Sequence, residues 1–149
     1  MIELVPATDE DIRAVAANMR AIEVEECRAF GRSPEEALQR GRKAARICHA
    51  ARLNGEPVAV YGLLVISLMG GVGSPWMLGT DEIGRHGRDL MRIARATVAE
   101  WQAVTPFLHN NVHAENAVSI RWLTRLGFTV EPRVADIGGQ PMRRFWKGP

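Results

Sequence analysis

The sequence predicts a mixed α/β (α+β) fold, in which about four helices pack on a central mixed sheet of about seven strands. Three observations lead to this prediction. The pair Asn54-Gly55 stands between two apolar runs, which is the strongest short-range signal for a β-hairpin. The stretch from His109 to Phe128 changes from alternating to helical periodicity. Along the whole chain the predicted elements follow the order strand, two helices, three strands, helix, strand, helix and two strands.

The first half of the chain starts its helices with capping residues. Thr8 is followed by Asp11 three residues later, and Ser33 is followed by Pro34 and then Glu36. Such side chains satisfy the backbone N–H groups that a helix start leaves free. We expect a strand at 2–5, a helix whose buried stripe runs from 12 to 22, a helix from 33 to about 46, and hairpin strands at 47–53 and 56–67.

The second half of the chain contains the change from strand to helix. Leu108 and Val112 alternate with polar residues in the strand, and Gly127 ends the helix because it takes a left-handed conformation without a Cβ penalty. Phe128 is then placed to pack back on Leu123. The remaining elements are expected as a strand at 76–78, a helical turn at 80–86, helices at 87–101 and 117–126, and strands at 107–113, 128–134 and 142–146.

The composition indicates one globular domain over residues 1–149, with 46% hydrophobic and 24% charged residues. A net charge of +2, with basic and acidic residues interleaved, does not indicate a nucleic-acid partner. Cys27 and Cys48 stand far apart without a ligand-like spacing, so we expect reduced thiols and no metal site. Glycines interrupt the charge-free stretch from Pro57 to Thr80, and the N-terminus is acidic. We therefore expect no membrane span, no signal peptide and a cytoplasmic protein.

The stretch from Val112 to Phe128 resembles the last conserved segment of the GNAT acyltransferase superfamily. The residues that fall at the spacings of that segment are Val112, Asn116, Ser119, Trp122-Leu123 and Gly127-Phe128. The order of elements over the whole chain is also the order of the GNAT fold. The resemblance therefore implies a GNAT-like acyl-CoA N-acyltransferase fold and, as the activity, transfer of an acetyl group to an amine of unknown identity.

The resemblance also implies a site for acetyl-CoA. In the GNAT fold acyl-CoA binds where the fourth and fifth strands splay apart, and its pyrophosphate binds backbone N–H groups at the start of the next helix. The candidate cofactor-binding residues are Leu78, Gly79, Arg85, His86, Gly87, Arg88, Asn110, Asn116 and Ser119. Two of them have plainer explanations, because Asn110 can bond the neighbouring strand and Asn116 can cap the helix that follows it.

The loop before the long helix departs from the family pattern. Where the family has a glycine-rich phosphate motif, residues 82–88 begin with the acidic Glu82 and carry only two glycines, three residues apart. Arg85, His86 and Arg88 gather near the helix start, where cations suit a bound anion. The alternative is that these cations pair with the acidic residues mixed among them.

The catalytic groups of the family are also missing. Leu123 holds the position of the tyrosine that often protonates the leaving thiolate, and the only tyrosine, Tyr61, lies in a buried strand. Transfer to an amine needs a base with a pKa near the working pH. The candidates are Glu23, His109 and His113, with Glu25 and Glu26 beside Glu23. The alternatives are a solvated helix face for the glutamates and a structural role for each histidine.

A closer resemblance suggests a second function. The run from Ser67 to Glu82, with Ser119 to Leu123, looks like the GNAT-fold internal virion proteins of tailed phages and prophages. The protein could then be a non-catalytic assembly component inside a phage particle, with phage structural proteins as partners. The enzyme predicts an open cleft between Leu78 and Asn110, with free N–H groups at the next helix start. The assembly component predicts a cleft filled by side chains such as Trp76, Met77 or Trp122.

Overall fold

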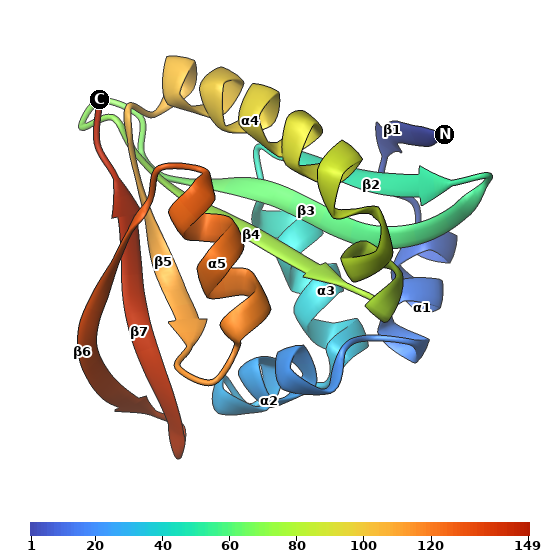
Figure 1. The fold of residues 1–149 in the computed structure, drawn as a ribbon, viewed down its shortest axis with the longest axis horizontal. Helices are drawn as coiled ribbons and strands as arrows, with labels where there is room; N and C mark the ends of the chain where they lie inside the picture. Colours follow the sequence, from blue (N-terminus) through green and yellow to red (C-terminus); the bar gives the residue numbers. More distant parts are fainter.

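The computed structural model describes residues 1–149 and contains a seven-stranded sheet with five α-helices (Figure 1). The mixed α/β fold is therefore confirmed, with one helix more than expected. The elements are β1 (Ile2–Pro6), α1 (Asp9–Ala17), α2 (Ala21–Ala29), α3 (Pro34–Ala44), β2 (Ile47–Leu53), β3 (Glu56–Ser67), β4 (Val72–Gly79), the 3-10 helix η1 (Asp81–His86), α4 (Gly87–Val104), β5 (Phe107–His113), α5 (Ala117–Arg125), β6 (Thr129–Ile137) and β7 (Gln140–Lys147).

The sheet has the strand order β1-β2-β3-β4-β5-β7-β6, and only β4 and β5 run parallel to each other. These two strands pair over just two residue pairs, Val72 with Phe107 and Gly73 with Leu108. Beyond Gly73 they diverge, and Figure 1 shows α2 lying between their separated ends. The sheet is thus open at its centre.

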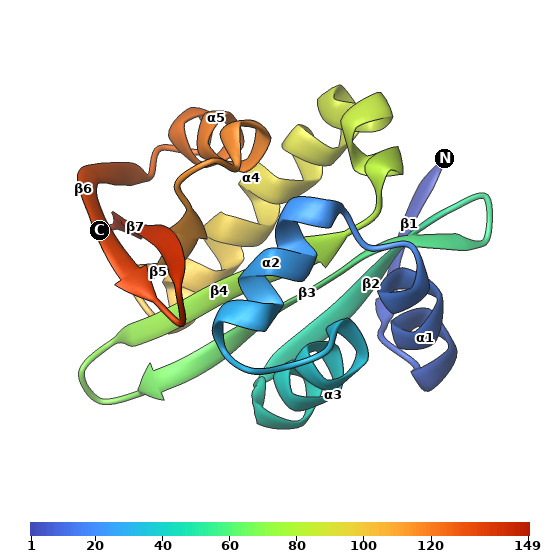
Figure 2. The same cartoon turned by 90° about the horizontal axis from the view of Figure 1, so that it is seen from below.

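Helices cover both faces of the sheet (Figure 2). The larger core lies under α4 and α5, and its buried residues include Leu63, Leu90, Trp101, Leu108 and Phe145. A smaller core lies under α1 and α3, on the other face, and consists of Ile12, Val15, Leu38, Ala50 and Val60. Both predicted capping patterns are present, because Asp11 N donates to Thr8 Oγ1 and Glu36 N donates to Ser33 Oγ, each over 3.2 Å.

The first predicted helix is wrong in its length. It was expected to continue to Ile22, but α1 ends at Ala17 and α2 starts again at Ala21. Between them Met19 forms an isolated bridge with Thr80, and Arg20 N donates to Gly79 O over 3.0 Å. The backbone of this segment pairs with the free edge of β4 instead of continuing the helix. This break accounts for the additional helix.

The strand predicted at 76–78 is longer than expected, since β4 begins at Val72 within the glycine-rich stretch. The end of α5 agrees with the prediction: Gly127 has φ 91°, and Phe128 N donates to Leu123 O over 2.9 Å. Phe128 is buried in the larger core, against which Leu123 also packs. None of the helices combines the length and the apolar character needed to cross a bilayer.

The turn between β6 and β7 packs against α2, and a substitution there tests this contact. A Cβ at Gly138 would overlap the backbone of Ala29, whereas a Cβ at Gly139 would meet nothing; both glycines have positive φ. We expect Gly138→Ala to lower the free energy of unfolding by about 1–3 kcal/mol more than Gly139→Ala, since both share the φ strain and only one adds overlap. Urea denaturation of both variants measures the difference. Equal losses would contradict the packing.

Candidate functional site

The polar backbone groups of β4 alternate between its two neighbours. Thr80 N donates to Val58 O of β3 over 2.9 Å, and Phe107 N donates to Gly71 O over 3.0 Å, at the start of β5. Even-numbered residues of β4 therefore direct their N–H and C=O groups to β3, and odd-numbered residues direct theirs towards β5. The hydrogen-bond partners of the odd-numbered residues therefore determine which backbone groups in the gap between the strands are free to bind a ligand.

The hydrogen-bond ladder between β4 and β5 stops at Gly73 because of the residue that follows in the alternation. The next odd-numbered residue is Pro75, which has no N–H to donate. Its C=O accepts a hydrogen bond from Asn110 Nδ2 of β5 over 2.9 Å, so a side chain replaces the backbone contact. Asn110 thus has the backbone partner on the splayed strand that its plainer explanation requires.

The two odd-numbered residues that follow differ from each other. Both backbone groups of Gly79 have hydrogen-bond partners, because its N–H donates to Glu23 Oε1 over 3.0 Å and its C=O accepts from Arg20 N over 3.0 Å. Met77 faces the gap at a point where β4 has no partner strand. Its N–H and C=O are the backbone groups of β4 that remain available to a ligand.

A cleft of about 1270 Å³ occupies this gap. It is lined by Ile93 and Thr97 of α4 and by Gly41 and Ala44 of α3, although these helices lie on opposite faces of the sheet (Figure 2). The cleft therefore passes between β4 and β5 from one face to the other. A ligand entering from the α4 side can meet one entering from the α3 side beside Met77.

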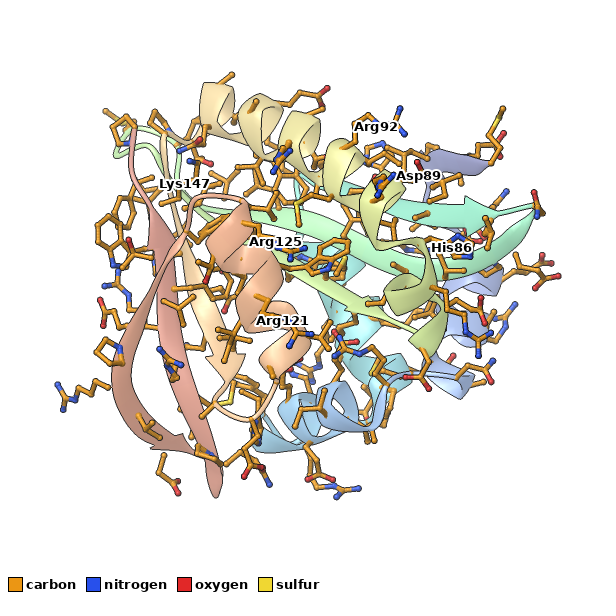
Figure 3. All side chains as sticks on the ribbon, in the orientation of Figure 1. His86, Asp89, Arg92, Arg121, Arg125 and Lys147 are labelled. Carbon is orange, nitrogen blue, oxygen red and sulfur yellow. The ribbon has the colours of Figure 1, made fainter.

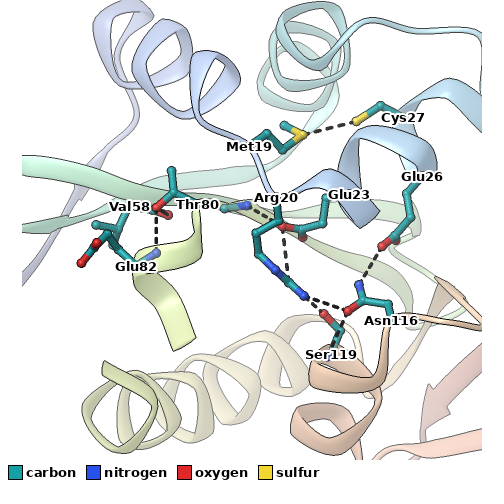
Figure 4. Close-up of polar contacts among 11 residues, drawn as sticks. Met19, Arg20, Glu23, Glu26, Cys27, Val58, Thr80, Glu82, Asn116 and Ser119 are labelled. Carbon is teal, nitrogen blue, oxygen red and sulfur yellow. Dashed lines mark hydrogen bonds and ion pairs between the residues drawn. The ribbon is translucent and has the colours of Figure 1, made fainter. Parts of the chain in front are cut away.

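A hydrogen-bonded network of charged and polar side chains lines the cleft (Figure 4). Arg20 donates to Asn116 Oδ1 over 2.9 Å and to Ser119 Oγ over 3.4 Å, and its Nη1 lies 3.5 Å from Glu23 Oε1. Asn116 donates in turn to Glu26 Oε1 over 2.8 Å. Arg20, Glu23 and Asn116 are buried. The network joins the start of α2 to the start of α5 across the gap.

Two carboxyl groups of this network are held away from water. Burial raises the pKa of Glu23 to about 8, against the opposing effects of the Arg20 guanidinium and the Gly79 N–H. Burial also raises the pKa of Glu26, while the hydrogen bond from Asn116 lowers it. Arg20 is shared between Glu23, Asn116 and Ser119, so its charge compensates the Glu23 carboxylate only in part. Glu23 therefore changes its charge close to neutral pH.

The structure separates the three candidate bases. Glu23 lines the cleft and is not part of a solvated helix face. His113 is buried outside the cleft lining: its Nδ1 accepts from Glu115 N over 3.1 Å, so its Nε2 carries the hydrogen and donates to Gln140 Oε1 over 2.8 Å. His109 also lies outside the lining, and its ring packs at a tilt against Phe107. Of the three, Glu23 alone can face a ligand in the cleft.

Six of the nine candidate cofactor-binding residues line a cleft. Leu78, Asn110, Asn116 and Ser119 line the central cleft, and Gly87 and Arg88 line a second cleft between α4 and α5. Gly79, Arg85 and His86 line neither. Asn116 also caps α5, because its Oδ1 accepts from Ser119 N over 3.2 Å. The Gly79 N–H already has Glu23 as its partner.

The loop from Thr80 to Arg88 differs from the expected anion site. Residues 81–86 form η1, which runs directly into α4, so a 3-10 turn stands where the family has its glycine-rich loop, and no side chain caps the start of α4. Glu82 accepts from Arg85 over 2.8 Å and lies 3.9 Å from His86 Nε2. Arg85 therefore pairs with the preceding Glu82, which is the alternative that the sequence left open, and His86 lies beside the same carboxylate.

Arginines nevertheless line the second cleft, which has a volume of about 840 Å³. Its lining residues are Gly87, Arg88, Met91, Arg92, Arg95, Trp122 and Arg125. Figure 3 shows Arg92 on α4 and Arg121 and Arg125 on the neighbouring α5. Arg92 pairs with Asp89 over 2.6 Å, while Arg88, Arg95 and Arg125 have no acidic partner within 4 Å. Unpaired cations concentrated in a cleft favour an anionic ligand.

Sequence reasoning missed Arg20, the residue that connects most of the network. A single arginine after an apolar stripe carries no periodic signal, and its partners Asn116 and Ser119 lie 96 and 99 residues further along the chain. The burial of Glu23 and the partial burial of Glu26 were also missed, because a continuous helix would have placed them in solvent. The detectable signal was local: the spacing of Arg20 and Glu23 is that of an ion pair on one helical turn.

Comparison with known proteins identifies the fold. No protein-family model and no curated protein matches the sequence. Among solved structures, spermidine N-acetyltransferase from Vibrio cholerae in complex with CoA and spermine matches with a TM-score of 0.70 at 14% identity, over 98% of this chain and 94% of that chain. The Bacillus subtilis acetyltransferase in complex with CoA matches with a TM-score of 0.66 at 10% identity, over 99% and 97%.

A GNAT-family acetyltransferase from Streptococcus pneumoniae also matches, with a TM-score of 0.63 at 15% identity, over 99% of this chain and 98% of that chain. The chain therefore has the fold of the GNAT acetyltransferases, as the sequence predicted. The closer resemblance to internal virion proteins receives no support from these structures.

The raised pKa of Glu23 predicts how stability depends on pH. Between the ordinary carboxyl pKa of 4.5 and about 8, the folded protein holds a proton that the unfolded chain has released. The free energy of unfolding should therefore fall as pH rises through this window, by up to about 1.4 kcal/mol per pH unit. Glu23→Gln should remove most of this slope, because its amide stays neutral. Urea denaturation from pH 5 to pH 8.5 measures it.

The matched control for this experiment is Glu25→Gln, because Glu25 lies on the same helix but is half-exposed and pairs with Arg28 at the surface. That variant should keep the slope of the unchanged protein. A slope that survives in Glu23→Gln would show that burial does not raise the pKa of Glu23.

Proposed function

We propose that the protein is an acyl-CoA-dependent N-acyltransferase that transfers an acetyl group to an amine. The observation that carries the proposal is the cleft between β4 and β5, which brings the free N–H of Met77 and the buried carboxyl group of Glu23 into one cavity. The GNAT fold and the CoA present in two of the similar structures support it. Acetyl-CoA would supply the acetyl group as an activated thioester.

The residues of the chain fit the two ends of acetyl-CoA. The arginine-lined cleft between α4 and α5 suits its phosphates, with Arg88, Arg95 and Arg125 as the unpaired cations. The central cleft suits its uncharged arm, because Met77, Leu78 and most of the other lining side chains are apolar. Trp122 lines both clefts, so they meet at this side chain. In this proposal the arginines replace the glycine-rich phosphate loop.

Met77 and Glu23 would carry out the chemistry that the chain contributes. The Met77 N–H is directed into the gap and would donate to the carbonyl oxygen on which negative charge grows. The Glu23 carboxylate would take the proton from the acceptor's ammonium group, because its pKa of about 8 lies near the pKa range useful to a base at neutral pH. The amine nitrogen then forms the C–N bond while the C–S bond breaks.

The departing sulfur would take its proton from water. Leu123 stands where the family often has a tyrosine. Tyr61 lines the cleft, but it is buried and its ring packs against Trp101. Arg20 would hold Glu23 and Asn116 in place without touching the acceptor, because its guanidinium is buried among its partners.

The alternative assembly role predicts that bulky side chains fill the cleft. Trp76 lines the cleft, but its ring packs against α3 and β3, where a Cβ at Gly41 or at Gly62 would overlap it. Met77 and Trp122 line the cleft, which keeps a volume of about 1270 Å³. These contacts favour the enzyme, and no contact in the structure favours a role in a phage particle.

Binding of acetyl-CoA tests the phosphate cleft. Arg88→Glu should weaken binding by about tenfold or more, because it replaces an unpaired cation of the cleft with an anion. Arg85→Glu is the matched control, since Arg85 pairs with Glu82 outside the cleft, and it should change the affinity little. Isothermal titration measures both affinities. No binding at millimolar acetyl-CoA would overturn the proposed function.

Turnover tests the base. With a reactive primary amine as acceptor, Glu23→Gln should lower kcat by about 100-fold or more while leaving the affinity for acetyl-CoA unchanged. In the unchanged protein, activity should rise as pH approaches about 8, because Glu23 must lose its proton to act. Thiol release, followed with a colorimetric reagent, measures both. A variant that keeps full activity with the same pH profile would exclude Glu23 as the base.

A further inference from the structure

The side of the cleft formed by α3 has a charge pattern that the transfer reaction does not explain. Three cations line it: Arg32 after α2, and Arg40 and Lys43 on α3. None of them lies within 4 Å of a carboxylate, and none makes a side-chain hydrogen bond. By contrast Arg42, on the same helix, does not line the cleft and pairs with Asp9 over 2.7 Å.

The acidic residues of the cleft lie elsewhere in it. Among all the lining residues the carboxylates are Glu23 and Glu26, both within the Arg20 network. The α3 side thus presents positive charge alone, and the network presents the carboxylates. All three cations are exposed to solvent, and their like charges add up on this side of the cleft. One end of the cleft suits an ammonium group, and the other end suits an anion.

Between these ends the lining is apolar. Phe30, Leu64 and Trp76 lie along the cleft, and Phe30 and Leu64 remain exposed to solvent. Glu23 lies in α2, and Phe30 is the C-cap residue of the same helix seven positions later, which corresponds to about 10 Å at 1.5 Å per residue. A ligand that reaches from Glu23 to the cations therefore needs an apolar body of roughly this length.

We propose that the acceptor is a small amine with an apolar body and an anionic group, a carboxylate or phosphonate, at its far end. This inference rests on the proposed function for the position of the amine beside Glu23, and on the charges of the α3 side for the anion. Arg40 and Lys43 bind the anionic group, and the apolar lining holds the chain between the two ends. A polyamine is disfavoured, because its second ammonium group would lie among these cations.

Three acceptors of equal chain length distinguish the possibilities: 8-aminooctanoate, octylamine and 1,8-diaminooctane. We expect 8-aminooctanoate to bind about tenfold or more tightly than octylamine, and the diamine to bind most weakly. Isothermal titration of each compound into the protein, with and without CoA, measures affinity independently of turnover. Thiol release from acetyl-CoA with the same three compounds should give the same order of kcat/KM.

The double variant Arg40→Glu with Lys43→Glu should reverse this order, so that the diamine binds better than 8-aminooctanoate. Arg46→Glu is the matched control, because Arg46 is an exposed cation next to α3 that does not line the cleft, and it should keep the original order. Equal affinities for the three compounds, or a preference for the diamine in the unchanged protein, would overturn the inference.

The same experiment separates this inference from the proposed function. If octylamine is acetylated and 8-aminooctanoate is not preferred, the proposed transferase activity stands and the inference of an anionic acceptor is wrong. If the protein does not bind acetyl-CoA, the proposed transferase function is wrong. The order of affinities of the three compounds would still decide whether the α3 side selects an anionic group.

Discussion

The ladder between β4 and β5 reaches only to Gly73, because the next residue directed at β5 is Pro75, which has no N–H to give. The remaining structure follows from this interruption. Asn110 bonds the Pro75 carbonyl from the side of β5, and α2 lies between the separated strand ends. Buried backbone groups need partners. The first turn of α2 supplies them at Gly79, and only Met77 is left to a ligand.

The hydrogen bonds of Gly79 to Arg20 and Glu23 bring two ionisable side chains into the interior of the protein. Arg20 and Glu23 lose hydration when α2 packs against β4, and a pair of this kind contributes little to stability compared with apolar residues of similar volume. The network satisfies each member by hydrogen bonds to Asn116, Ser119 and the backbone. Titratable groups held at raised pKa values inside a cleft are found preferentially at functional sites, and this preference supports the role proposed for Glu23.

The sequence predicts most of the fold because its signals are local. The pair Asn54-Gly55 forms the turn of the β2–β3 hairpin, with positive φ at both residues, and Thr8 and Ser33 cap the helices that they were expected to start. Gly127 ends α5 in the left-handed conformation. Each of these features depends on residues within a few positions of one another, so composition and spacing are sufficient to find them.

The site is harder to predict because its parts depend on distant pairing. The break between α1 and α2 arises from the pairing of Met19 with Thr80, 61 residues later. The segment from Asn18 to Arg20 contains no proline or glycine that would predict a break from the sequence. Glu23 is buried only because that break redirects the helix. Asn110 and Asn116 could be singled out from the strand-to-helix unit, but their partners Pro75 and Glu26 come from other elements. The sequence therefore predicts the side chains of the site better than their environment.

The loop before α4 shows how the fold can be kept while the means of binding change. In η1 the backbone N–H groups are used within the 3-10 helix, and Thr80 Oγ1 accepts from Glu82 N at its start. They cannot also surround a pyrophosphate in the way that a glycine-rich loop does. Under the proposed function the task passes to the side chains of Arg88, Arg95 and Arg125. Arg88 and Arg95 lie about two helical turns apart on α4, and Arg125 lies on α5. Guanidinium groups are permanently charged and their planar donor forks match phosphate oxygens, so this cleft would select its ligand by its phosphates, and the cleft between β4 and β5 would select the acyl group and the acceptor.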